Sequence, residues 1–118
     1  QMKSTKVPSF NVIGNSPLVL RESLLDEVYT MGENFVEAAK RVVSPGMNGP
    51  FCIEGVYDEN AKFTSFEFSA RIVAGTNIYM DGSPYYSLLF NENMSMGKRI
   101  AREVKTATES NQLDKITT

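Results

Sequence analysis

Residues 51–72 constrain the fold most, because they have the pattern of two β-strands joined by a short polar turn. The first arm, 51–57, follows a proline, and the second arm, 62–72, is rich in phenylalanine and β-branched residues, which are typical of strands. The polar segment 58–61 between the two arms predicts the turn. We therefore expect an antiparallel hairpin against which the helices of the chain pack.

This hairpin brings two glutamates together. If the arms close through a four-residue loop, 59–62, Glu54 pairs with Glu67. Directly opposed side chains share a face and lie about 5 Å apart at Cβ. Two carboxylates in that position repel each other, and a cation between them turns the repulsion into a binding site that suits Mg²⁺. The alternative is a pair of solvent-facing strand residues, and a one-residue slip of register would separate them onto opposite faces.

Two amphipathic helices are expected, one before the hairpin in the sequence and one after it. Apolar residues recur at helical spacing over 24–43 and again over 96–111. Ser23 and Ser95 stand where N-cap residues stand, and Pro45 with the glycine after it ends the first helix. The fold class is therefore α+β, an antiparallel sheet with both helices packed on one face.

The remaining segments are short or irregular. Residues 1–7 form a linker, 10–13 form a short strand, and 78–94 form a loop-rich stretch with several aromatic residues. The chain has 118 residues and no internal repeat, so 1–118 is expected to be a single domain. Its first residues are polar and do not resemble a natural start, which indicates a fragment of a longer chain.

Composition excludes several classes of function. The chain has no histidine, which excludes a Ser-His-Asp triad, a Cys-His dyad and a histidine-ligated zinc site within it. Its single cysteine, Cys52, cannot form an internal disulfide and indicates a reducing compartment. The net charge of −2 provides no basic footprint for nucleic acid. We find no signal peptide and no long apolar stretch, so we expect a cytoplasmic protein without a membrane partner.

The second arm carries a recognisable motif. The run 66–71, with Glu67 and Arg71, resembles the E-x-N-x-R strand of ATP-grasp ligases, with Ser69 in place of asparagine. In that superfamily an acidic residue lies on the preceding antiparallel strand, where Glu54 stands here. The resemblance implies that Glu54 and Glu67 hold Mg²⁺ (or Mn²⁺) against the phosphates of ATP, with Val56 also at the nucleotide site. It also implies that Arg71 is catalytic and faces the reacting phosphates.

Four longer blocks narrow this resemblance. They follow the same order as in the archaeal FAICAR synthetase family, the formate-dependent ATP-grasp ligases of purine biosynthesis, and extend over nearly the whole chain. Four blocks are far more specific than the short motif alone. They comprise residues 14–25, 45–52, 69–77 and 94–103.

The family resemblance implies a carbon–nitrogen ligase reaction in IMP biosynthesis. ATP phosphorylates formate, and the amine of AICAR attacks the formyl phosphate to give FAICAR, ADP and phosphate. Asn15 matches a position that contacts AICAR, and an amide both donates and accepts hydrogen bonds, as that substrate requires. The partners would be ATP, formate, AICAR, the N-terminal and lid domains of the same enzyme, and other copies in a homo-oligomer. Without those domains the 118-residue chain should be the C-terminal portion and inactive alone.

Other candidate residues leave alternatives open. Arg21 precedes the first helix and would bind phosphate or formate, or else pair with an acid. Thr76 and Asn77 would bind substrate, or else form a plain turn after the strand. The aromatic residues of the loop-rich stretch favour packing over lining a pocket, and the basic residues of the last helix favour a solvated face. These two sets are Tyr79, Tyr85, Tyr86 and Phe90, and Lys98, Arg99, Arg102 and Lys105.

Two other functions remain open from sequence. The first is another ATP-grasp ligase with a different amine or acid substrate. The second is a non-catalytic module that binds nucleotide or assembles oligomers. The sequence upstream of Gln1 would distinguish them, since a glycine-rich lid with a basic residue there supports an enzyme.

Overall fold

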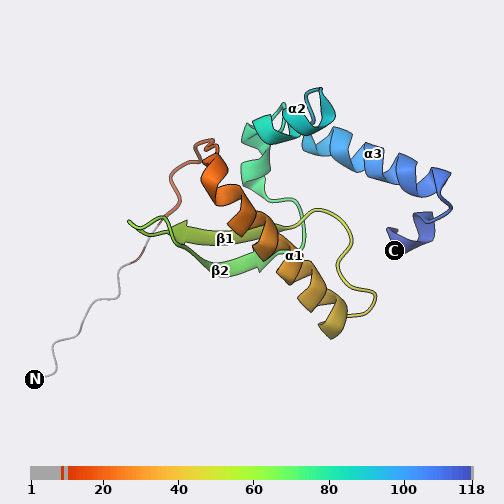
Figure 1. The fold of residues 1–118 in the computed structure, drawn as a ribbon, viewed down its shortest axis with the longest axis horizontal. Coiled ribbons are helices and arrows are strands. Elements are labelled where there is room, and N and C mark those ends of the chain that lie inside the picture. The colour runs from red at the N-terminus through yellow and green to blue at the C-terminus, as the bar shows by residue number, and fades with distance from the viewer. Residues whose placement is uncertain (1–8, 10, 118) are drawn as a thin grey trace, which may run out of the picture.

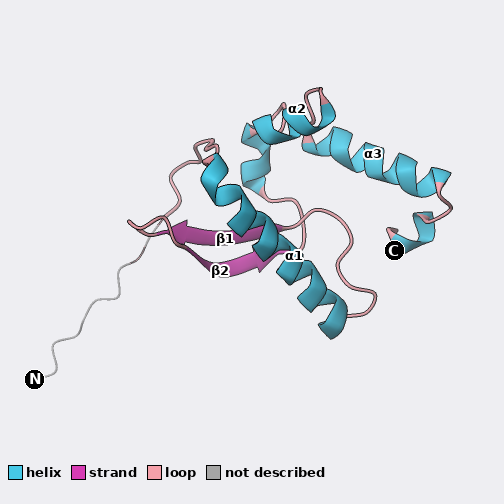
Figure 2. Cartoon of the chain, in the orientation of Figure 1, coloured by secondary structure: helices cyan, strands magenta, loops and turns pink. Residues whose placement is uncertain are grey.

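The computed structural model describes residue 9 and residues 11–117 (Figure 1). The predicted linker, 1–7, and Phe10 lie outside these residues. The described residues form an α+β fold, as expected, with three α-helices, a two-stranded antiparallel sheet and short 3₁₀-helices (Figure 2). The elements in chain order are η1 (Glu22–Leu24), α1 (Leu25–Val42), β1 (Cys52–Tyr57), β2 (Phe63–Ser69), η2 (Ala74–Ile78), α2 (Pro84–Phe90), α3 (Met96–Glu109) and η3 (Leu113–Lys115).

The sheet has the predicted register at the glutamates and a different register at the turn. Glu54 pairs with Glu67. The ladder then shifts by one residue between Glu54 and Gly55, so Tyr57 pairs with Phe63, whereas a 59–62 loop would pair it with Thr64. The loop of 59–62 was therefore wrong by one residue, since Asp58 also belongs to the turn. Its carboxylate accepts hydrogen bonds from the backbone N–H groups of residues 60 and 62, both at 2.9 Å, and closes a longer turn.

Helix α1 covers one face of this sheet (Figure 1). The ring of Phe35 lies 5.3 Å from the ring of Phe51 and 4.7 Å from that of Phe68, measured between centroids. Successive side chains of a strand point to opposite faces. Phe68 faces α1, so Glu67 and its partner Glu54 lie on the face that α1 leaves open.

The start of α1 differs from the prediction. Ser23 was expected to be the N-cap, but it lies inside η1, and Leu24 precedes α1 without a side-chain hydrogen bond. The 3₁₀ turn begins earlier, with the N–H of Leu24 donating to the carbonyl of Arg21 at 2.9 Å. Because this 3₁₀ turn includes Ser23, the serine does not stand at the N-cap position of α1.

The second predicted helix forms but does not pack on the sheet. Ser95 is its N-cap, as expected, and the Ser95 hydroxyl accepts a hydrogen bond from the N–H of Lys98 at 3.2 Å. Helix α3 extends away from the sheet (Figure 1), so the expectation that it covers the same face as α1 is corrected. Instead, its guanidinium groups hold it to α2, because Arg102 and Arg99 lie 4.7 Å and 5.3 Å from the Phe90 ring centroid.

Helix α2 was missed, because residues 78–94 were predicted to be loop-rich. The Ser83 hydroxyl caps it by accepting from the N–H of Tyr85 at 3.3 Å, and Pro84 occupies its first turn. Asn91 ends it in the left-handed conformation, with φ of 54°. A serine followed by proline is typical of a helix start as well as of a loop, and the loop interpretation was wrong here.

Little of the described chain is buried. Only the side chains of Met94 and Ala107 are buried within it, with exposed fractions of 1% and 8%. Leu88 and Leu89 of α2 are 79% and 71% exposed. Residues 11–13, part of the predicted strand 10–13, have no regular structure, and Ile13 is fully exposed. This many exposed apolar side chains indicate surfaces that contact other domains or other protein chains.

The close approach of Gly82 to the backbone of Met94 gives a stability prediction. Gly82 has a φ of +79°, and a Cβ there would overlap the backbone carbonyl of Met94. We expect Gly82→Ala to lower the free energy of unfolding of the full-length protein by at least about 2 kcal/mol, since both strain and overlap oppose it. Denaturant unfolding measures this change.

The matched control is Gly97→Ala. Gly97 lies in α3, and a Cβ there meets no atom within 4 Å. Alanine is the better helix former, so this variant should be as stable as the parent or slightly more stable. Equal stability of the two variants would show that the Gly82–Met94 contact is not a constraint.

Candidate functional site

The Glu54–Glu67 pair lies on the uncovered face of the hairpin. Glu54 is half-buried and Glu67 is exposed. Val56 follows on the same face of β1 and is 57% exposed. Among the residues described, neither glutamate forms an ion pair with a lysine or an arginine. The two carboxylates therefore face each other without a protein cation to neutralise them.

This pair fits a partial magnesium site. Hard carboxylate oxygens are the ligands that Mg²⁺ prefers, and Mg²⁺ is usually held by one or two carboxylates together with substrate phosphates and water. No group of three or more histidine, cysteine, aspartate or glutamate side chains gathers as a metal site within the described part of the chain. The donor set fits a metal that a phosphate ligand completes, and does not form a closed protein cage.

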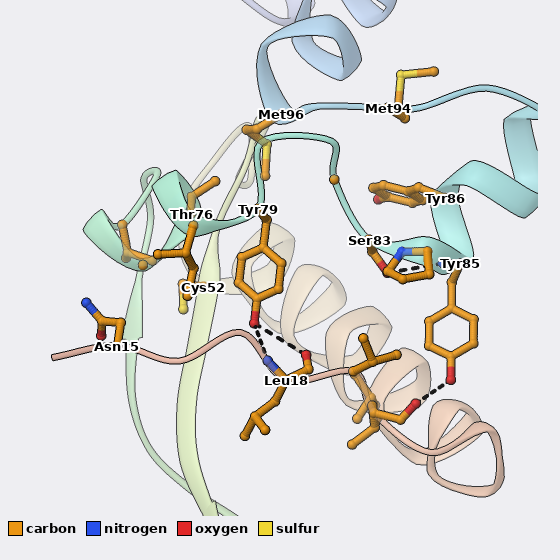
Figure 3. Close-up of a pocket in the computed structure, with 18 of the residues that line it drawn as sticks. Asn15, Leu18, Cys52, Thr76, Tyr79, Ser83, Tyr85, Tyr86, Met94 and Met96 are labelled. Atoms are coloured by element: carbon orange, nitrogen blue, oxygen red, sulfur yellow. Dashed lines mark hydrogen bonds between the residues drawn. The ribbon is translucent and has the colours of Figure 1, made fainter.

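Cys52 shares the face of the glutamates and is kept in its neutral form. Burial, and secondarily the negative charge of Glu54, raise the pKa of the Cys52 thiol above its ordinary value. A thiol held neutral at physiological pH is a poor nucleophile. Cys52 is therefore a packing residue of this site, and its sulfur lies beside the cavity described next (Figure 3).

A cavity of about 590 Å³ opens at the Cys52 end of β1, between the segment before α1, the α1 helix, η2 and the start of α2 (Figure 3). Its lining is mainly apolar, with Tyr86, Met94 and Met96 on one side. Asn15 and Thr76 provide polar groups at the side near Cys52. An apolar cavity with a few polar groups suits a flat, partly polar ring.

The structure brings together some of the predicted site residues. Asn15 and Thr76 line the cavity, and Cys52 connects it to the Glu54 face through β1. Asn77 lies in η2 and is exposed, outside the cavity lining. The segment around these two residues is a 3₁₀-helix and not the plain turn that was the alternative.

The two predicted arginines lie apart from the cavity lining. Arg21 is exposed at the entry to η1. Arg71 is exposed, and its guanidinium donates to the carbonyl of Ile72 at 3.0 Å. The second arm was predicted over 62–72, which would place Arg71 two alternations from Glu67 on the same strand face, but β2 ends at Ser69 and does not include Arg71. That placement is corrected, although the backbone still sets Arg71 close after the motif strand.

Sequence reasoning undervalued the tyrosines. Packing was favoured for them, but Tyr79, Tyr85 and Tyr86 all line the cavity. Phe90 does pack, against Tyr86 and the α3 arginines. The expected solvated face of α3 is likewise only partly open, since the Arg99 side chain is 29% exposed. The sequence signal of a pocket was the gathering of three tyrosines within residues 79–86.

Comparison with known proteins supplies the family. A family profile described as "Domain of unknown function (DUF1297)" matches residues 1–118, the whole chain. The chain belongs to the DUF1297 family.

Relatives of this DUF1297 chain carry a functional name. A protein of Nitrosopumilus maritimus is 91% identical over 118 residues, all of this chain and 35% of that protein. One of Cenarchaeum symbiosum is 71% identical over the same length and share. One of Sulfurisphaera tokodaii is 54% identical over 111 residues, 94% of this chain and 33% of the relative. All three are named 5-formaminoimidazole-4-carboxamide-1-(beta)-D-ribofuranosyl 5'-monophosphate synthetase.

These matches confirm the resemblance to FAICAR synthetases found in the four sequence blocks. The DUF1297 chain spans about a third of the length of the curated relatives that it matches. Within its described residues, no helix is both long enough and apolar enough to cross a membrane.

The cysteine beside the glutamates gives a pH prediction. Alkylation of Cys52 in the full-length protein should accelerate with a midpoint above the ordinary thiol pKa, because burial and Glu54 favour the neutral thiol. Glu54→Gln should lower that midpoint only partly, since burial is the larger cause. Mass spectrometry of the Cys52 peptide across pH measures both. A midpoint unchanged by Glu54→Gln would contradict the proximity of the two groups.

Proposed function

We propose that this chain is the C-terminal portion of an ATP-grasp ligase that formylates AICAR with ATP and formate to give FAICAR. The observation that carries the proposal is the 91% identity over the whole chain to a protein named as the corresponding synthetase. The Glu54–Glu67 pairing adds physical support, because it provides the carboxylates that a metal–nucleotide site requires.

Under this proposal Glu54 and Glu67 hold Mg²⁺ (or Mn²⁺) at the phosphates of ATP, with Val56 on the same face beside the nucleotide. The metal neutralises phosphate charge and orients the phosphates for transfer. The open face of the hairpin supports this role, since α1 covers only the other face.

AICAR occupies the cavity in this proposal. Its flat imidazole ring matches the apolar lining, and the Asn15 amide and Thr76 hydroxyl, which line the cavity, would bond its carboxamide and amine. The γ-phosphoryl group passes from ATP to a formate oxygen, and ADP leaves. The AICAR amine then attacks the formyl carbon, phosphate leaves with the bonding electrons, and the amine loses a proton.

The exposed basic residues have a place in this reaction. Arg71 is the proposed catalytic cation at the phosphates, and Arg21, with Asn77, the proposed contact to substrate. Among the ion pairs of the described chain, neither arginine is paired with an acid, so neither positive charge is neutralised by a carboxylate. Arg71 would have to exchange its bond to the Ile72 carbonyl for one to phosphate.

The rest of the enzyme completes the site. A lid and an N-terminal domain would bind adenine and cover the open sheet face, which explains why so much apolar surface is exposed. We further propose a cytoplasmic homo-oligomer. The unpaired Cys52 thiol supports the reducing compartment, and the exposed Leu88 and Leu89 support an additional interface.

The test uses full-length protein with ATP, formate, AICAR and Mg²⁺. We expect FAICAR to form, and ATP hydrolysis to require both formate and AICAR. Glu67→Gln should lower kcat by about 100-fold or more, since even outer-shell changes at metal sites cost about 10- to 100-fold. Raised Mn²⁺ should restore part of this loss.

Glu59→Gln is the matched control, because Glu59 lies in the exposed hairpin turn and the substitution removes the same charge. It should leave kcat within about twofold. ATP hydrolysis that is no faster with AICAR and formate than without them would reject the proposed reaction. Equal losses from the two substitutions would reject the metal role of Glu67.

A further inference from the structure

The segment that carries Asn15 has little structure of its own. Residues 11–20 form no helix and no strand, and Leu18 is 81% exposed. In the described chain no backbone-to-backbone hydrogen bond joins these residues to any other element. Nevertheless the segment forms one wall of the cavity, through Asn15, Ser16 and Leu18. Something other than backbone pairing must hold it there.

Two tyrosine hydroxyls provide that attachment (Figure 3). The Tyr79 hydroxyl accepts from the N–H of Leu18 at 3.0 Å and donates to the carbonyl of the same residue at 3.3 Å. The Tyr85 hydroxyl donates to the carbonyl of Leu20. In a hydrogen-bonded pair of an antiparallel β-sheet, a residue exchanges both its N–H and its C=O with one residue of the neighbouring strand. A single hydroxyl, which both donates and accepts, replaces that neighbour at Leu18.

The hydrogen bonds at Leu18 also restrict the position of Asn15, because the backbone between the two residues has little conformational freedom. Pro17 has its φ fixed by its ring, and the residue before a proline, Ser16, is confined to extended conformations. Only these two residues separate the bonded Leu18 from Asn15. Fixing Leu18 therefore limits where the Asn15 amide can lie in the cavity.

We propose that Tyr79 is a positioning residue that holds Asn15 against the cavity through its paired hydrogen bonds to the backbone of Leu18. This inference rests on the proposed function for the identity of the ligand, AICAR. It assigns Tyr79 no part in the transfer of phosphoryl or formyl groups. Loss of the hydroxyl should therefore weaken AICAR binding and spare the chemical step.

The first experiment is steady-state kinetics on the full-length protein with Tyr79→Phe, which keeps the ring in the cavity and removes both bonds. We expect the KM for AICAR to rise about tenfold, which corresponds to ~1.4 kcal/mol, with kcat and the KM for ATP within about twofold. Tyr57→Phe is the matched control, since Tyr57 ends β1 and its ring packs on Phe63. It should change none of these constants by more than about twofold.

A double-mutant cycle tests whether Tyr79 acts through Asn15. In an Asn15→Ala background, Tyr79→Phe should change the KM for AICAR by less than about twofold, because the group that it positions is gone. A tenfold effect that persists in this background would overturn the inference, since the hydroxyl would then contact the ligand directly. A fall in kcat equal to the rise in KM would also overturn it.

Hydrogen exchange separates this inference from the proposed reaction. The Leu18 amide should exchange about tenfold faster in Tyr79→Phe than in the parent or in Tyr57→Phe, whether or not the enzyme forms FAICAR. Absence of FAICAR with the parent protein would reject the proposed function alone. An unchanged Leu18 exchange rate would reject the positioning role of Tyr79.

Discussion

The contact of Phe35 with Phe51 and Phe68 determines the use of the two faces of the hairpin. It places α1 on one face, with ring centroids 5.3 Å and 4.7 Å apart, and so directs Glu54 and Glu67 to the other. A two-stranded sheet alone is marginally stable, so the helix is what makes the pair of carboxylates a fixed feature. The charged face remains open because no second helix of the described chain covers it.

The parts of the fold that follow from local pattern were predictable. The extent of α1 and the Ser95 cap both come from spacing within short windows. The longer turn was not, because it depends on the carboxylate of Asp58 bonding two specific N–H groups. The direction of α3 was also out of reach, since it is set by arginines stacking on Phe90, a contact between separate elements.

The residues of the candidate site also include some that the sequence predicted and some that it did not. The Glu54–Glu67 pair was predicted, but the four-residue loop assumed for it was wrong, and the one-residue shift between Glu54 and Gly55 restores the pairing. Asn15 came from the family resemblance. The cavity itself could not be foreseen, because it forms where segments distant in sequence meet, and Tyr79 bonds a backbone 61 residues away. Arg71 shows the opposite failure, since a strand pattern was extended past Ser69, where the strand ends. Local periodicity therefore predicts which side chains share a face of a helix or strand, whereas a cavity depends on tertiary contacts between distant segments.

The central claim is that Glu54 and Glu67 together hold the metal of a nucleotide site that the rest of the enzyme completes. The most direct test is a crystal structure of the full-length protein with Mn²⁺ and a non-hydrolysable ATP analogue, with anomalous diffraction locating the metal. We predict an anomalous peak about 2.0–2.3 Å from an oxygen of each carboxylate and from a phosphate oxygen. A metal bound to the phosphates with neither glutamate as a ligand would contradict the account.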